Sequence, residues 1–185
     1  MENRNLDKLR PIIGLIIFSV IISILNPRFL TMGNLLNVFR QTSINAIIAA
    51  GMTFVILSAG IDLSVGSILG FSGAVGAKML ASGYNIWLSL LVAIVIGAVA
   101  GIVNGIIITR GKVQPFIATL AIMILLRGAT MVFTSGRPIP VSGEHISGVF
   151  RWIGTGVVLG IPVPIAIMII VFIVCYYILT HTQYG

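Results

Sequence analysis

Residues 58–67 read SAGIDLSVGS and place one carboxylate, that of Asp62, in the middle of an apolar stretch. Between residues 42 and 77, Asp62 carries the only charge. An ionised carboxylate in hydrocarbon costs roughly 2.5–3.5 kcal/mol, so Asp62 must reach water, cap a backbone or pair with another group. The stretch is too long for one membrane span and too apolar for a loop. It therefore predicts two membrane helices that are separated by a polar break.

The composition predicts an integral membrane protein. Of the 185 residues, 58% are hydrophobic and 8% are charged, whereas a soluble domain carries about 25% charged residues. A helix that spans the bilayer needs about 20 mostly apolar residues, and several runs of that length follow one another. A transmembrane barrel would instead show alternating segments of about 10 residues, which are not visible. We therefore expect an all-α, polytopic helix bundle in the lipid bilayer.

Six membrane spans fit the sequence, and together they form a single transmembrane domain over residues 1–185. The segment 26–41 is amphipathic and is expected at the membrane interface, and a loop is expected from Ser135 to about Gly156. The chain ends directly after the last span, which predicts that the domain is incomplete at its C-terminus. The expected spans are residues 11–25, 42–58, 64–80, 86–108, 116–134 and 157–179.

The basic residues read as helix-end anchors. The net charge is +7, but the basic residues are spread singly between apolar runs, so no nucleic-acid partner is expected. The loop charges divide evenly between the two sides of the membrane. Arg4, Lys8 and Arg10 precede the first span, and the first helix usually dominates orientation, so the N-terminus is predicted to be cytoplasmic.

Asp62 supports two interpretations that can hold together. A lone acid inside a membrane marks a solute or ion pathway, and broken helices near the midplane form binding sites in many transporters. Alternatively, Asp62 or Ser64 caps the N-terminus of the following helix by accepting from its free N–H groups. A helix break is tolerated in a membrane where it faces protein or water.

Other polar side chains inside the spans are further candidates for a translocation path. Each of them either joins helices by hydrogen bonds or contacts a solute. Arg127 lies late in the fifth span, where it either extends to the interface or faces a hydroxylated or anionic solute at the outer mouth. The full candidate set is Asn45, Ser58, Asp62, Ser64, Asn104, Thr119 and Arg127.

Small residues form ridges along two of the spans. Gly66 and Gly70 recur at a spacing of four in the third span, and Gly97, Gly101 and Gly105 do so in the fourth. Such ridges let helices approach closely, because lipid supplies no hydrophobic drive for helix association. These glycines are therefore predicted to be helix-packing residues.

The sequence does not resemble an enzyme. His145 and His181 fall on opposite sides of the membrane in this topology, so they share no metal. Gly111-Lys112 is not preceded by the spacing of a phosphate-binding loop. We expect no catalytic residue, cofactor or metal, and any nucleotide energy must come from another chain.

Several blocks of sequence together resemble the permease subunits of ribose-type ABC sugar importers. They cover most of the chain after about residue 26. The blocks read NLLN (34–37), QTSINA (41–46), GMTFVILSAGIDLSVGS (51–67), GKVQPFIATL (111–120), LRG (126–128) and GIPVP (160–164).

The resemblance implies a ten-helix permease fold in the bacterial cytoplasmic (inner) membrane, of which this chain is the N-terminal portion. It implies a homodimer, a cytoplasmic ABC ATPase subunit, and a periplasmic or lipid-anchored sugar-binding protein. It also implies import of ribose or a related monosaccharide by alternating access. The alternatives are an ion-coupled carrier or channel in which Asp62 titrates, and a membrane scaffold that transports nothing.

Overall fold

The computed structural model describes residues 4–141, 148–158 and 160–182, with side chains from residue 11 onward. Most of these residues are helical, which confirms the all-α fold. The elements in chain order are α1 (Arg4–Leu25), α2 (Met32–Leu57), α3 (Val65–Ala81), α4 (Ile86–Thr109), α5 (Pro115–Thr134), α6 (Gly148–Thr155), β1 (Val157–Val158), β2 (Ile161–Pro162) and α7 (Val163–His181).

Four helices, α2, α4, α5 and α7, are long and apolar enough to cross a membrane. Two shorter apolar helices, residues 11–25 of α1 and the whole of α3, add to them. These six segments correspond to the six that hydropathy predicts, although several boundaries differ. The structure is therefore a polytopic membrane helix bundle.

Three helices begin well away from the expected residues, and part of the expected loop is helical. α1 begins at Arg4, seven residues before the expected span. α2 begins at Met32 and continues unbroken to Leu57, so the amphipathic segment is mostly the first part of the same helix. α7 begins at Val163, after the antiparallel pair β1–β2. Gly160 makes this tight reversal possible, because its φ of 82° is one that glycine adopts without steric cost. Residues 148–155 form α6 within the expected loop.

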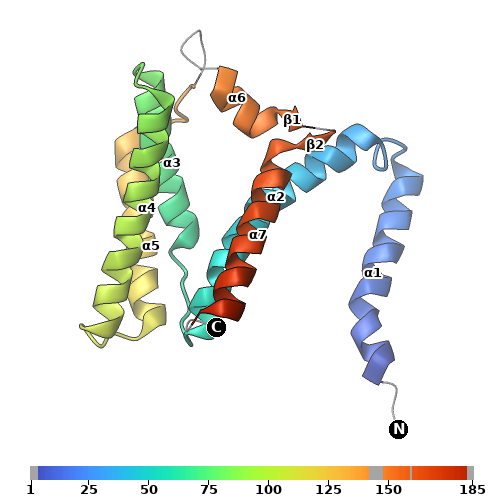
Figure 1. Ribbon diagram of the computed structural model, residues 1–185, viewed down its shortest axis with the longest axis horizontal. Coiled ribbons are helices and arrows are strands. Elements are labelled where there is room, and N and C mark those ends of the chain that lie inside the picture. The colour runs from blue at the N-terminus through green and yellow to red at the C-terminus, as the bar shows by residue number, and fades with distance from the viewer. Residues whose placement is uncertain (1–3, 142–147, 159, 183–185) are drawn as a thin grey trace.

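The helices form two groups (Figure 1). α3, α4 and α5 pack together into a three-helix cluster, and α2 packs along α7. α6 and the β1–β2 pair lie at the end of the molecule where α7 begins, and α1 stands apart from both groups. Phe71 of α3 meets Phe133 of α5 edge to face, with ring centroids 6.2 Å apart, so aromatic packing joins the middle of α3 to the last turn of α5.

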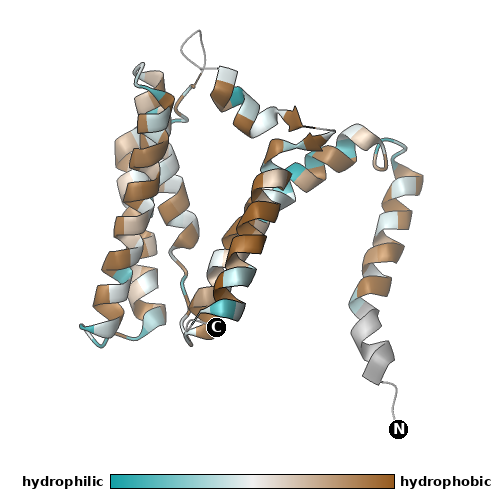
Figure 2. Ribbon diagram, in the orientation of Figure 1, coloured by the Kyte–Doolittle hydropathy of each residue, from teal (hydrophilic) through white to brown (hydrophobic). Residues whose placement is uncertain are grey.

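Burial is inverted relative to a water-soluble domain. Apolar side chains cover the outside of the helices, and most of the ribbon in Figure 2 is coloured brown for hydrophobic residues. Ile94, Leu125 and Ile173 are each more than 60% exposed. Small polar side chains occupy the inside instead, where interhelical hydrogen bonds and close packing hold membrane helices together. The buried polar side chains are Ser43, Ser64, Ser67, Ser72, Ser89, Asn104 and Thr119.

Candidate functional site

The polar break between α2 and α3 begins with a tight helix terminus. The N–H of Ala59 donates to the carbonyl of Ile56 at 2.9 Å, and the N–H of Gly60 donates to that of Val55 at 2.9 Å. Ala59 takes a left-handed φ of 56° to make this reversal. A Cβ on Gly60 would lie 3.1 Å from the carbonyl oxygen of Val55, so the residue at 60 must be small. These contacts end α2 at Leu57.

Asp62 organises the start of α3. Its Oδ1 accepts from the backbone N–H of Ser64 at 2.7 Å and from the hydroxyl of Ser64 at 2.5 Å. Ser64 is the last residue before α3 and is fully buried. An ionised carboxylate makes stronger hydrogen bonds than a neutral acceptor, so this pair fixes the path of the chain into α3.

Asn104 connects α4 to this pair. Its Nδ2 donates to the Ser64 hydroxyl oxygen at 2.7 Å. Because the same hydroxyl donates its proton to Asp62, the chain of hydrogen bonds has one direction, from Asn104 through Ser64 to the carboxylate. Asn104 is 4% exposed, and its Oδ1 has no hydrogen-bond partner within the described part of the chain. A buried acceptor is thus left without a donor among those residues.

Thr119 ties α5 to the break. The N–H of Leu63 donates to the Thr119 hydroxyl at 3.2 Å, and that hydroxyl lies 3.3 Å from the carbonyl oxygen of Ile61. The same hydroxyl also donates back to Pro115 of its own helix at 2.8 Å. The unpaired backbone of the break is therefore satisfied by a side chain from another helix, as non-helical backbone at membrane depth requires.

A cavity of about 320 Å³ opens beside these residues. Two glycines of α4, Gly101 and Gly105, leave room for it, and a Cβ on either would meet nothing within 4 Å. The wall combines apolar side chains with the polar groups of the break. The lining residues are Val55, Ser58, Gly60, Ile61, Asp62, Gly101, Asn104, Gly105, Ile108, Thr109, Pro115 and Thr119.

The structure brings together five of the seven candidate polar residues. Ser58, Asp62, Asn104 and Thr119 line the cavity, and Ser64 is bonded to two of them. The other two lie elsewhere. Asn45 is exposed on α2, and Arg127 is exposed on α5, and neither lines the cavity. Any contact of these two with a solute stays a prediction.

The predicted packing glycines differ in their surroundings. A Cβ on Gly97 would lie 3.7 Å from Cγ2 of Ile68, so α3 and α4 are in contact there. At Gly66 and Gly70, as at the two cavity glycines, nothing within the described residues would lie within 4 Å of a Cβ. Among the glycines of α3 and α4, a Cβ would make its closest contact between the two helices at Gly76, where it would lie 3.4 Å from that of Ala93. Gly76 is outside the two predicted glycine ridges, although the small residue Ser72 stands four residues before it.

The described residues contain no cluster of three or more His, Cys, Asp or Glu side chains that could hold a metal ion. The site offers mainly hydrogen-bond acceptors: the Asp62 carboxylate, the free Oδ1 of Asn104 and the carbonyl groups of the break. It is suited to a ligand that donates hydrogen bonds.

Comparison with known proteins places the sequence of this chain in a transport family. The family model described as "Branched-chain amino acid transport system / permease component" matches residues 34–185. No solved structure matches the chain.

Three curated relatives are import permeases. A ribose import permease protein of Haemophilus influenzae is 54% identical over 98% of this chain and 56% of its own length. A ribose import permease protein of Bacillus subtilis is 49% identical over 97% of this chain and 55% of its own length. A fructose import permease protein of Bifidobacterium longum is 38% identical over 83% of this chain and 43% of its own length. The chain thus spans about half the length of the curated relatives it matches.

Proposed function

The chain belongs to the family of branched-chain amino acid transport system permease components, and we propose that it serves an ATP-driven importer of ribose or a related monosaccharide. As a family member it is a multi-pass inner-membrane component of a transport system rather than an enzyme. The choice of a sugar rests on the ribose import permeases, which are 49–54% identical to it.

The cavity at the break supports a path for a neutral, hydroxylated solute. Sugars present many hydroxyl donors, and the cavity supplies acceptors, among them the buried Oδ1 of Asn104 that has no partner in the described chain. Its volume of about 320 Å³ lies at the lower end of the range for small-molecule sites, about 300–1,000 Å³. We propose that a sugar hydroxyl donates to Asn104 during passage, with Asp62 and Thr119 nearby.

The grouping of the helices suits alternating access. Asp62, Ser64, Asn104 and Thr119 fasten the start of α3 to α4 and α5, whereas α2 packs along α7. The break between α2 and α3 therefore joins two packing units. A difference in free energy between two arrangements of these units would let ATP binding and hydrolysis on another chain open the path to each side in turn.

The proposed partners follow from the same function. They are a cytoplasmic ABC ATPase subunit, a periplasmic or lipid-anchored sugar-binding protein, and a second copy of the permease. The N-terminus is proposed to be cytoplasmic, because its basic residues precede the first helix.

Uptake of radiolabelled ribose into cells tests this function. We expect uptake when the protein is produced together with its ATPase and its sugar-binding protein, and none when either partner is deleted. Uptake that persists without the ATPase and stops when the proton or sodium gradient is collapsed would contradict the proposal and favour an ion-coupled carrier.

A further inference from the structure

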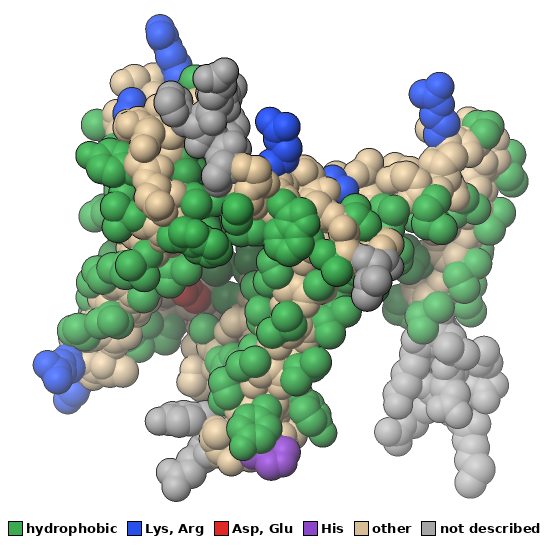
Figure 3. All heavy atoms as spheres, turned by 45° about the horizontal axis from the view of Figure 1, so that its top comes forward, with side chains coloured by type: hydrophobic (Ala, Val, Ile, Leu, Met, Phe, Trp, Pro, Cys, Tyr) green, Lys and Arg blue, Asp and Glu red, His purple; other side chains and the backbone are tan. Residues whose placement is uncertain are grey.

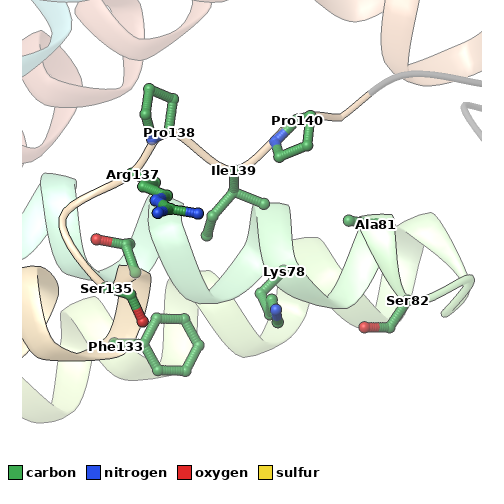
Figure 4. A pocket seen from close by; sticks show the side chains of 10 residues that line it. Lys78, Ala81, Ser82, Phe133, Ser135, Arg137, Pro138, Ile139 and Pro140 are labelled. Carbon is green, nitrogen blue, oxygen red and sulfur yellow. The ribbon is translucent and has the colours of Figure 1, made fainter.

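A second pocket lies at the opposite end of the three-helix cluster from the Asp62 break. Its volume is about 360 Å³. Lys78, in the last turn of α3, and Arg137, in the segment that follows α5, both border it (Figure 4). Ser82, Thr134 and Ser135 add hydroxyl groups to the lining of this pocket. The remaining lining residues, Ala81, Phe133, Pro138, Ile139 and Pro140, are apolar or small.

The two cations have no acidic neighbour among the residues whose side chains are described. Asp62 is the single acid among them, and it is bonded to Ser64 before α3 begins. Lys78 lies thirteen residues beyond Val65, the first residue of α3, which at 1.5 Å per residue is about 20 Å along the helix. Other basic side chains also gather at this end of the molecule (Figure 3), so the surrounding potential is positive and attracts anions.

An apolar groove continues from this pocket along the bundle. It has a volume of about 460 Å³ and shares Thr134, Arg137, Pro138 and Ile139 with the pocket. Its floor is the small-residue face of α3, and α5 contributes Thr130 and Met131. The α3 residues are Gly70, Gly73, Ala74 and Ala77. A cationic pocket at helix ends thus opens directly into an apolar groove along the helices.

We infer that this pocket and groove bind one anionic phospholipid, with its phosphate between Lys78 and Arg137 and one acyl chain in the groove. Guanidinium and ammonium groups donate charge-assisted hydrogen bonds to phosphate oxygens. The hydroxyls of Ser82 and Ser135 can act as further donors, whereas that of Thr134 donates to the carbonyl of Thr130. Basic pockets between membrane helices recognise anionic headgroups for this reason. The apolar groove favours a lipid over free phosphate as the ligand, because free phosphate has no acyl chain to fill the groove. The inference does not rest on sugar transport.

Native mass spectrometry of the purified protein in neutral detergent tests this inference, with phosphatidylglycerol and phosphatidylcholine as probes. We expect phosphatidylglycerol to bind more tightly than phosphatidylcholine. Lys78→Gln and Arg137→Gln should each weaken its binding about fivefold, the equivalent of about 1 kcal/mol per basic residue. Gly73→Leu should also weaken it, because the new side chain enters the groove where nothing within 4 Å opposes it. Arg28→Gln, a basic residue in the turn before α2, is the matched control and should change nothing.

Four outcomes would overturn the inference. The first is equal binding of both lipids, and the second is unchanged binding in both cation variants. The third is competition by millimolar inorganic phosphate together with full binding by Gly73→Leu, which would indicate a site for a free anion. Glu144 lies outside the described residues, so Glu144→Gln is measured as well. If phosphatidylglycerol binds that variant and not the wild type, an internal ion pair occupies the cations and the inference fails.

Discussion

Replacing Asp62 with alanine should destabilise the three-helix cluster by about 2–3 kcal/mol. The substitution removes the acceptor of two hydrogen bonds, from the N–H and the hydroxyl of Ser64, and Ser64 is fully buried. A buried donor that loses its partner costs about 1–3 kcal/mol. The hydroxyl can turn toward another acceptor, so its loss is nearer to the average of about 0.6 kcal/mol for a hydrogen bond between membrane helices. The N–H of Ser64 has no such freedom.

The asparagine variant separates charge from geometry. Asp62→Asn keeps an oxygen at the position of Oδ1 but removes the charge, and charge-assisted hydrogen bonds are roughly twice as strong as neutral ones. We therefore expect Asp62→Asn to lose about 1 kcal/mol, roughly half the effect of alanine. Ile61→Ala is the matched control, since Ile61 is in the same break but is 53% exposed and apolar.

Equilibrium unfolding in mixed micelles, titrated with dodecyl sulfate and followed by circular dichroism, measures these differences. The expected order of stability is wild type, then Asp62→Asn, then Asp62→Ala, with Ile61→Ala close to wild type. If alanine at position 62 is no more harmful than alanine at position 61, then the hydrogen bonds to Ser64 do not hold α3 in place and the reasoning fails.

Three further substitutions test the packing around the break in the same titration. Thr119→Val should cost about 0.6–1.7 kcal/mol because it removes the acceptor of the Leu63 N–H, and Thr119→Ser should restore stability; equal loss in both would contradict this role. Ala59→Gly should stabilise the protein by about 1 kcal/mol, because Ala59 has a left-handed φ of 56°; a loss of stability would show that the strain is absent. Gly76→Leu should separate α3 from α4 and lower the yield of folded protein, since a Cβ there already lies 3.4 Å from that of Ala93; a normal yield would contradict the close approach.

Local chemistry explains why the break could be predicted from the sequence. A single carboxylate between two apolar runs can adopt few local structures that avoid its burial in hydrocarbon. Asp62 and Ser64 are two residues apart, so they can form a hydrogen bond without contacts from the rest of the fold. The six apolar segments could also be predicted from the sequence, because the thickness of the bilayer sets the length of a spanning helix.

The partners of the break and the cavity were beyond sequence reasoning. α4 is apolar around its whole circumference, so periodicity does not indicate which face Asn104 or the neighbouring glycines occupy. The spacing of Gly101 and Gly105 predicts packing residues, because ridges of small residues usually let helices approach closely. The arrangement of the three helices shows that these two glycines also line the cavity. The late start of α7 depends on the β1–β2 pair. Its strands are two residues long, which is too short to give a recognisable sequence pattern.

Filling the cavity tests most directly whether the solute passes the Asp62 break. Gly105→Leu places a side chain in the cavity while meeting nothing within 4 Å at its Cβ, and Gly128→Leu makes the same change in open space on α5, away from the cavity. Sugar uptake by cells that carry each variant with the native ATPase and binding protein, normalised to the amount of folded protein in the membrane, is the measurement. The account predicts that Gly105→Leu loses most of its uptake and that Gly128→Leu retains it. Wild-type uptake by a correctly folded Gly105→Leu protein would contradict it.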